Sequence, residues 1–493
     1  MFHISDVKKY SRCPKLFHSS LHEEQEKPYH SFVRLDEEIT QLAARKLGVG
    51  DCFTGERGQA GDAALQAMDQ FEWIVKGRFE YNDLRVKVPF LHKTSEGWDL
   101  YFLFIGNKPH NDDILFYCAT VWVLENNGID LNTIRLIHLN EDYVRGDELD
   151  VNELFVVSDY FYNHKGNPTE LVEVAIYKKM GDYSNILAEM KEVAMMDEVE
   201  AVHSNKCTRR SKCTHYDLCF PNELVEPDNS ILTLASSQHK HEMHAEGLTL
   251  LRDADPARVE GTLAQYAQIR ADQLGGLYVD RLALSTWLSN LRFPLVFVDF
   301  EWDTYAIPPY RGLRPYSVCL FEYSVHVLYQ DGSLAHKEYI GTGDCRKQLM
   351  ENLYRDIPEK GTLIAYNADG AEKIRLRELG EQFPEYESKM NHLINRMEDL
   401  QQPFMNGIVY DVRMRGLYSL KQIMAMLDDE GYRNLDIHQG MDAVFVWRQL
   451  DRHELEETEE ALEHLKAYCG MDTYAMIVVY RWLVQLAQNG CKI

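Results

Sequence analysis

The chain has 493 residues, which is too long for a single hydrophobic core. Of these residues 45% are hydrophobic and 26% charged, a composition typical of a folded globular protein. Its formal net charge of -26 argues against a surface that binds nucleic acid everywhere, although a local basic strip on an acidic enzyme is compatible with it. No segment resembles a signal peptide, and the longest apolar run, residues 114–124, is too short to span a bilayer and is expected to be a buried element. We therefore expect a cytoplasmic protein of roughly two to four domains, whose cysteines are reduced or bound to metal.

The first block, residues 1 to about 225, has cysteines near both of its ends. One lies in YSRCPKLF, and three are spaced evenly in CTRRSKCTHYDLC. Four thiolates can enclose an iron-sulfur cluster or a tetrahedral zinc ion, and ligation would join two segments that otherwise fray. His203 and His215 are additional ligands if the metal is zinc. The predicted thiolate ligands are Cys13, Cys207, Cys213 and Cys219.

One early cysteine followed by a late triplet resembles the iron-sulfur staple of RecB/AddB-type nucleases. This resemblance implies a RecB-like, restriction-endonuclease-type domain holding a 4Fe-4S cluster, with zinc as the alternative. Such nucleases carry an acidic residue on one strand and Glu-x-Lys on the next. In LRVKVPFLHKTSEGWDLYFLFIG these positions fall on Pro89 and on Phe102 to Phe104, so we expect a catalytically degenerate domain. A shifted alignment would place the site at Glu80 or Asp99 instead.

Basic residues gather between the three late cysteines. Their positive charge could contact the phosphates of nucleic acid, although exposed lysine and arginine side chains are also common in loops without a ligand. The residues of this patch are Lys206, Arg209, Arg210 and Lys212.

The middle block, residues 226–292, begins with the polar run SSQHKHEMHAEG and continues as helical segments, which predicts a helical connector. The last block, residues 293–493, reads as a strand, a strand pair with an Asp-Gly turn, a further strand and then helices. That order predicts an α/β or α+β fold in which helices cover a mixed sheet.

Two carboxylates lie inside the first strand of this last block, in LVFVDFEW. Because side chains alternate along a strand, Asp299 and Glu301 point to the same face and repel each other. A hard divalent cation between them would relieve the repulsion. A strand that simply ends in water is the alternative reading of the same pattern.

Further acidic ligands must come from other segments of this block. The stretch IAYNADGAEKIRLREL predicts a strand ending at Asn367, followed by a helix that bears Asp369 and Glu372. Asp399 in RMEDLQQPF is a supporting candidate.

The last candidate stretch is LKAYCGMDTYAM. Tyr468 and Asp472 are four residues apart in a predicted helix and so share one face, where a carboxylate could bind metal and a phenol could orient water. Each of these features is common in proteins without a metal, and it is their order along the chain that points to a function.

That order resembles the DnaQ-like (DEDD) 3'-5' exonucleases, which have a ribonuclease H-like fold. The motif YCGMD, with Ala467 five residues before Asp472, is similar to the DEDDy branch. The resemblance implies two divalent ions, Mg or Mn, about 4 Å apart. Asp299, Glu301 and Asp472 would be their ligands.

In the same family, Tyr468 would orient the attacking water. The second motif departs from the usual Asn-x3-Asp pattern, so the resemblance leaves open whether Glu372 or Asp369 serves there.

Stretches such as EDLQQPF, GLYSLKQIM and YCGMDTYAM resemble a bacterial family of unknown function that joins an iron-sulfur RecB/AddB-like module to such an exonuclease domain. The resemblance covers nearly the whole chain and is specific mainly beyond residue 290. The resemblance implies a metal-dependent nuclease whose substrate is single-stranded DNA or RNA, or the end of a DNA or RNA strand. The alternative is a non-catalytic nucleic-acid- or partner-binding protein with two degenerate nuclease folds. The expected domains are residues 1–225, the connector 226–292 and the exonuclease domain 293–493.

Overall fold

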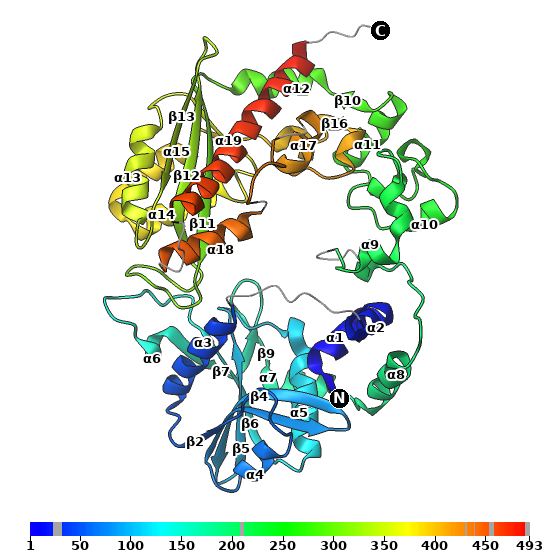
Figure 1. Cartoon of the computed structure of the whole chain (residues 1–493), viewed down its shortest axis with the longest axis vertical. Helices are drawn as coiled ribbons and strands as arrows, with labels where there is room; N and C mark the ends of the chain where they lie inside the picture. Colours follow the sequence, from blue (N-terminus) through cyan, green and yellow to red (C-terminus); the bar gives the residue numbers. More distant parts are fainter. Residues whose placement is uncertain (23–31, 208–211, 429–430, 438, 453–457, 489–493) are drawn as a thin grey trace. The chain divides into compact units, whose positions relative to one another are not determined.

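The computed structural model describes residues 1–22, 32–207, 212–428, 431–437, 439–452 and 458–488 (Figure 1). The chain divides into two units, one made of Met1–Phe220 with Tyr305–Tyr316 and the other of Pro221–Thr304 with Ser317–Ile493. Both units combine helices with mixed sheets, as the sequence predicted for the last block. None of the helices in the described ranges is long and apolar enough to cross a membrane.

The first unit is built on a seven-stranded sheet in the order β2-β3-β4-β5-β6-β7, with β1 paired to β4. The pairs β2–β3, β5–β6 and β1–β4 are parallel, and the others are antiparallel. The strands are β1 (Phe2–His3), β2 (Cys52–Thr54), β3 (Trp73–Tyr81), β4 (Leu84–Thr94), β5 (Gly97–Phe104), β6 (Leu131–Leu139) and β7 (Phe155–Ser158), with the separate hairpin β8 (Tyr160–Tyr162) and β9 (Pro168–Leu171).

The apolar run 114–124 is confirmed as a buried element, helix α5 (Ile114–Asn126). Its side chains from Tyr117 to Leu124 are buried all around the helix, because the helix lies in the main core of the unit. The other helices of the unit are α1 (Ile4–Arg12), α2 (Pro14–His22), α3 (Phe32–Leu47), α4 (Ala63–Ala67), α6 (Val151–Leu154), α7 (Val172–Lys179), α8 (Ser184–Ala194) and α9 (Tyr216–Cys219).

Residues 305–316 belong to the first unit although the strands before and after them belong to the second. Arg145 fixes this loop, donating from its backbone N–H to Leu313 O at 2.9 Å and from its guanidinium to Pro308 O at 2.7 Å. Ala306 and Ile307 are buried in an apolar cluster of the same unit. The connection between β11 and β12 is therefore anchored at many points within the first unit.

The second unit contains a five-stranded sheet in the order β13-β12-β11-β14-β15. Strands β13, β12 and β11 are antiparallel neighbours, and β14 and β15 continue the sheet in parallel with β11. The predicted hairpin with its Asp-Gly turn is confirmed as β12 and β13, and Gly332 adopts a positive φ of 87° in the turn. The strands are β11 (Leu295–Thr304), β12 (Val318–Leu328), β13 (Leu334–Ile340), β14 (Thr362–Ala365) and β15 (Met397–Asp399).

Helices cover both faces of this sheet (Figure 1). One face packs on α13 (Arg346–Asp356), α14 (Glu372–Gln382) and α15 (Glu387–Ile394). The long helix α19 (Thr458–Gln488) crosses the other face and contacts β11, β12 and β13. Further elements of the unit are α16 (Gln402–Met405), α17 (Leu420–Leu427), α18 (Gly440–Asp451) and the strand pair β10 (Leu277–Val279) with β16 (Val409–Asp411).

The alternation of side chains along β11 explains why acids reach the interior. Val296, Val298 and Phe300 point into the core beneath α13 to α15. Leu295 and Phe297 start the opposite face, which α19 covers, and Asp299 and Glu301 continue that face by the period of two. The acidic residues therefore lie under a helix and not in bulk water.

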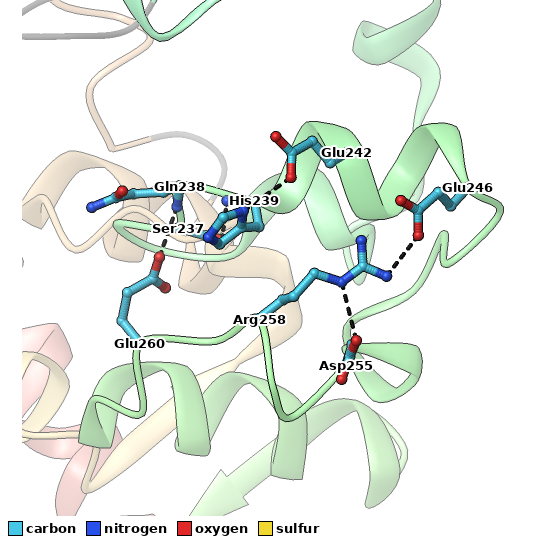
Figure 2. A network of polar contacts seen from close by, with 8 residues as sticks. All are labelled: Ser237, Gln238, His239, Glu242, Glu246, Asp255, Arg258 and Glu260. Carbon is cyan, nitrogen blue, oxygen red and sulfur yellow. Dashed lines mark hydrogen bonds and ion pairs between the residues drawn. The ribbon is translucent and has the colours of Figure 1, made fainter.

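Residues 221–292 form part of the second unit. Helices α11 (Leu263–Gln273) and α12 (Arg281–Asn290) contribute Ala267, Leu284 and Trp287 to the same core as α19. Around α10 (Lys240–Ala245), a polar network holds the segment together, with Arg258 donating to Glu246 at 2.6 Å and to Asp255 at 3.0 Å (Figure 2).

Candidate functional site

Three carboxylates meet between β11 and α19. Asp299 and Glu301 belong to β11 and Asp472 to α19, and one oxygen of each lies within 4.8 Å of the others. Glu301 and Asp472 are only 8% and 9% exposed. Oxygen ligands of a hard cation, at about 2.0–2.6 Å from it, have such mutual spacings.

Asp303, two residues beyond Glu301, shows how this strand neutralises an acid with a basic partner. Arg448 of α18 donates to both of its oxygens at 2.6 Å. Among the described residues, Asp299, Glu301 and Asp472 form no such ion pair with lysine or arginine. Their charge is therefore left for another cation to balance.

Glu372 is the second-motif carboxylate that the structure brings near the centre. It is the first residue of α14, is 3% exposed, and has one carboxylate oxygen without a hydrogen-bond partner in the described structure. Its charge raises the pKa of Asp299, after the larger effects of burial, Asp472 and Glu301.

Asp369 does not lie on this helix, so its prediction as a helical neighbour of Glu372 was wrong. The chain leaves β14 through Asn367, whose φ is 63°, and Asp369 falls in the turn before α14. There it accepts a hydrogen bond from Lys373 at 2.7 Å, and its side chain is 61% exposed.

Asp399, at the end of β15, supports this turn. Its carboxylate accepts the backbone N–H groups of Asn367 at 2.9 Å and Gln401 at 2.8 Å. It thereby fixes the chain that leads from β14 to Glu372.

Glu322 is a further carboxylate that the sequence did not reveal. It lies directly opposite Glu301 in the β11–β12 register, next to a β-bulge between Glu301 and Trp302. It is 1% exposed, and neither of its oxygens has a hydrogen-bond partner within the described chain. Like charges facing each other across two strands are unfavourable, so this pair needs compensation.

The pKa values of these acids are displaced upwards, mainly by burial. Burial, with the charges of Asp472 and Glu322, holds the pKa of Glu301 well above its usual range. Burial raises the pKa of Glu322 and of Glu372 to about 8, and that of Asp472 to about 6. Without a cation, the ionised centre is therefore unfavourable near neutral pH.

Two tyrosines and a lysine line the α19 side of the centre. Tyr468 accepts a hydrogen bond from Lys421 at 2.9 Å, and Tyr432 donates to Asp472 at 2.5 Å. Tyr468 was predicted, and it does share a helix face with Asp472. Sequence reasoning missed Lys421 and Tyr432, since nothing in SLKQIM or in EGYRN signals a position near the acids.

In the first unit, the four predicted cysteines line one pocket together with His215 and Tyr216. Cys13 lies between α1 and α2, Cys207 and Cys213 precede the short helix α9, and Cys219 is its last residue. Burial, followed by the charges of Cys13, Cys213 and Cys207, raises the pKa of Cys219.

The four sulfurs do not form a group as compact as the carboxylate centre. Within the described chain, none of these cysteines belongs to a group of three or more potential ligand atoms that all lie within 4.8 Å of one another. One tetrahedral zinc ion would bring its sulfurs to about 3.8 Å from one another.

The expected basic patch is described only in part, because Arg209 and Arg210 lie outside the described residues. Lys206 donates to Ser11 O at 2.7 Å, and Lys212 pairs with Asp217 at 2.6 Å. Both lysines therefore have partners within the unit.

The residues aligned with the RecB-type motif lie on two adjacent strands. Pro89 lies on β4, and Phe102 and Phe104 lie on β5, which pairs with β4 in antiparallel register. Phe102 is fully buried and packs edge-on against Tyr117 at 4.7 Å between ring centroids. An apolar core therefore occupies the position aligned with Glu-x-Lys.

The two acids of the shifted alignment have protein partners. Asp99 accepts hydrogen bonds from Asn132 at 2.8 Å and Thr133 at 2.7 Å, and Glu80 forms an ion pair with Arg85.

Comparison with known families gives one partial match. A family model described as Domain of unknown function (DUF2779) matches residues 296–419, which include Asp299, Glu301 and Glu372 and end before α19. No curated protein and no solved structure matches the chain.

The raised pKa values predict that metal-free protein loses stability as pH rises. The folded state holds protons that the unfolded chain releases near pH 4–5, so the free energy of unfolding should fall between about pH 5 and 8. Saturating manganese should remove most of this fall. Urea unfolding in EDTA and in manganese, at several pH values, measures both effects.

In the same experiment, Glu322→Gln should flatten the pH dependence in EDTA, while Glu351→Gln on the exposed face of α13 should not. Stability that depends on neither pH nor metal would show that the acids are compensated in some other way.

Proposed function

We propose that the second unit is a metal-dependent nuclease, a DEDDy-type 3'-5' exonuclease that hydrolyses phosphodiester bonds at the ends of DNA or RNA. The observation that carries the proposal is the meeting of Asp299, Glu301 and Asp472 without a basic ion-pair partner in the described residues. The buried, incompletely hydrogen-bonded carboxylates of Glu322 and Glu372 add to the negative charge of this centre.

Divalent cations, when bound, would activate water and stabilise the leaving oxygen of the phosphodiester. Asp299, Glu301 and Asp472 would hold them, with Glu372 as the fourth acid of the motif. Tyr468 lies one helical turn before Asp472 on the same face of α19, and its hydroxyl would orient the attacking water. The central position of β11 in a mixed five-stranded sheet supports a ribonuclease H-like domain.

The first unit is proposed to be a RecB-like platform without chemistry of its own. The four-cysteine pocket supports a metal staple that joins Cys13 to the segment 207–219. Four thiolates around one pocket fit a 4Fe-4S cluster, with zinc as the alternative. Nucleic acid is the proposed partner of the whole chain.

Asp299→Ala is expected to abolish manganese-dependent digestion of labelled single-stranded DNA and RNA, by about a thousandfold or more, because it deletes a cation ligand. The fold should persist, since the change also relieves repulsion. Asp369→Ala is the matched control and should retain wild-type activity, because its carboxylate is exposed and pairs with Lys373.

If the wild-type protein binds these strands but does not cut them with any divalent ion, the non-catalytic nucleic-acid-binding alternative replaces the nuclease.

Because the first unit is proposed to lack catalytic residues, we expect all cleavage to come from the second unit. The double variant Asp299→Ala with Asp472→Ala should be inactive with magnesium and with manganese, whereas Asp99→Asn and Glu80→Gln in the wild-type background should leave the cleavage rate unchanged. Residual metal-dependent cleavage that disappears on mutating Asp99 or Glu80 would locate a working site in the first unit.

Cys13→Ser should lower the melting temperature of the first unit by about 5 °C or more, because it removes one ligand of the staple. Cys52→Ser, on β2 and away from the pocket, is the control and should have little effect. Anaerobically purified wild-type protein should be brown and contain iron and sulfide. Colourless protein with stoichiometric zinc would establish the zinc alternative.

A further inference from the structure

Lys421 places a fixed positive charge beside the carboxylate centre. It lies in the first turn of α17, whose N-terminus is fixed by the Ser419 side chain accepting the Gln422 N–H at 3.3 Å. Its ammonium lies 4.7 Å from the ring centroid of Tyr468 and 5.4 Å from that of Tyr432. Two aromatic faces and a capped helix therefore restrict where this charge can be.

The hydrogen bond between Lys421 and Tyr468 has only one possible direction. A protonated lysine has donors and no acceptor, so the Tyr468 oxygen accepts at 2.9 Å. The hydroxyl hydrogen of Tyr468 must then point elsewhere, and Asp472 lies one helical turn away on the same face of α19. Tyr432 already donates to Oδ1 of Asp472 at 2.5 Å, which keeps that carboxylate in place.

We propose that Lys421 is a positioning residue of this centre, which orients the Tyr468 hydroxyl with its hydrogen directed toward the acids and the water between them. This role rests on the proposed nuclease function. Lys421 donates to Tyr468, and it acts on the centre through that hydroxyl.

This role separates metal binding from turnover in experiment. Lys421 is not one of the cation ligands, so without it a divalent cation should bind with an affinity close to that of the wild type. Tyr468 loses the donor that sets its direction, so turnover should fall. A lysine that only stabilised the fold would lower metal affinity and turnover together.

The test compares Lys421→Met, Lys421→Arg and the wild-type chain. Manganese affinity is measured from the free-ion electron paramagnetic resonance signal, and kcat and KM from digestion of a labelled single strand. For Lys421→Met we expect kcat to fall about a hundredfold, KM to change by less than about threefold, and manganese to bind with an affinity close to that of the wild type. Lys421→Arg should recover much of kcat, because a guanidinium also donates to the phenol oxygen.

Lys389→Met is the matched control. Lys389 also lies over two tyrosine rings, at 4.8 Å from Tyr354 and 4.9 Å from Tyr386, but on α15 beneath the other face of the sheet. Its replacement should change neither turnover nor manganese affinity.

Wild-type kcat in Lys421→Met, or weaker manganese binding in that variant, would overturn the role of Lys421. A wild-type chain that cleaves no strand would instead refute the nuclease. In that case the role of Lys421 fails together with the nuclease on which it rests.

Discussion

Mutual repulsion among buried carboxylates is the constraint on which the second unit depends. Asp299, Glu301 and Asp472 share one small volume, while Glu322 faces Glu301 and Glu372 raises the pKa of Asp299. Burying unpaired charge is costly, and a protein retains such a cluster only where something compensates it. Asp303 on the same strand has that compensation in Arg448, and the centre does not have it among the described residues.

The surrounding structure serves to hold these acids close together. β11 is central in its sheet, and α19 crosses the face on which Asp299 and Glu301 lie. The apolar contacts of both core clusters stabilise this arrangement against the repulsion. The loop between β11 and β12 is anchored in the first unit, so the two strands that carry Glu301 and Glu322 are joined by a segment that does not belong to their own unit.

Local patterns predicted much of this centre. Period-two alternation showed that Asp299 and Glu301 share a face, and helical spacing did the same for Tyr468 and Asp472. Glu322 could not be recognised, because its burial follows from strand register and from the helix above it, neither of which a short stretch of sequence contains. Lys421 and Tyr432 were missed for the same reason, and Asp369 was misplaced because the left-handed turn at Asn367 delays the start of α14.

The central claim is that cations compensate the carboxylates of the second unit. Its most direct test is a crystal structure of the chain soaked in manganese, with the ions located by anomalous scattering. The account predicts two peaks about 4 Å apart, in contact with Asp299, Glu301 and Asp472. Well-ordered carboxylates without an anomalous peak, paired instead through shared protons or a lysine, would contradict it.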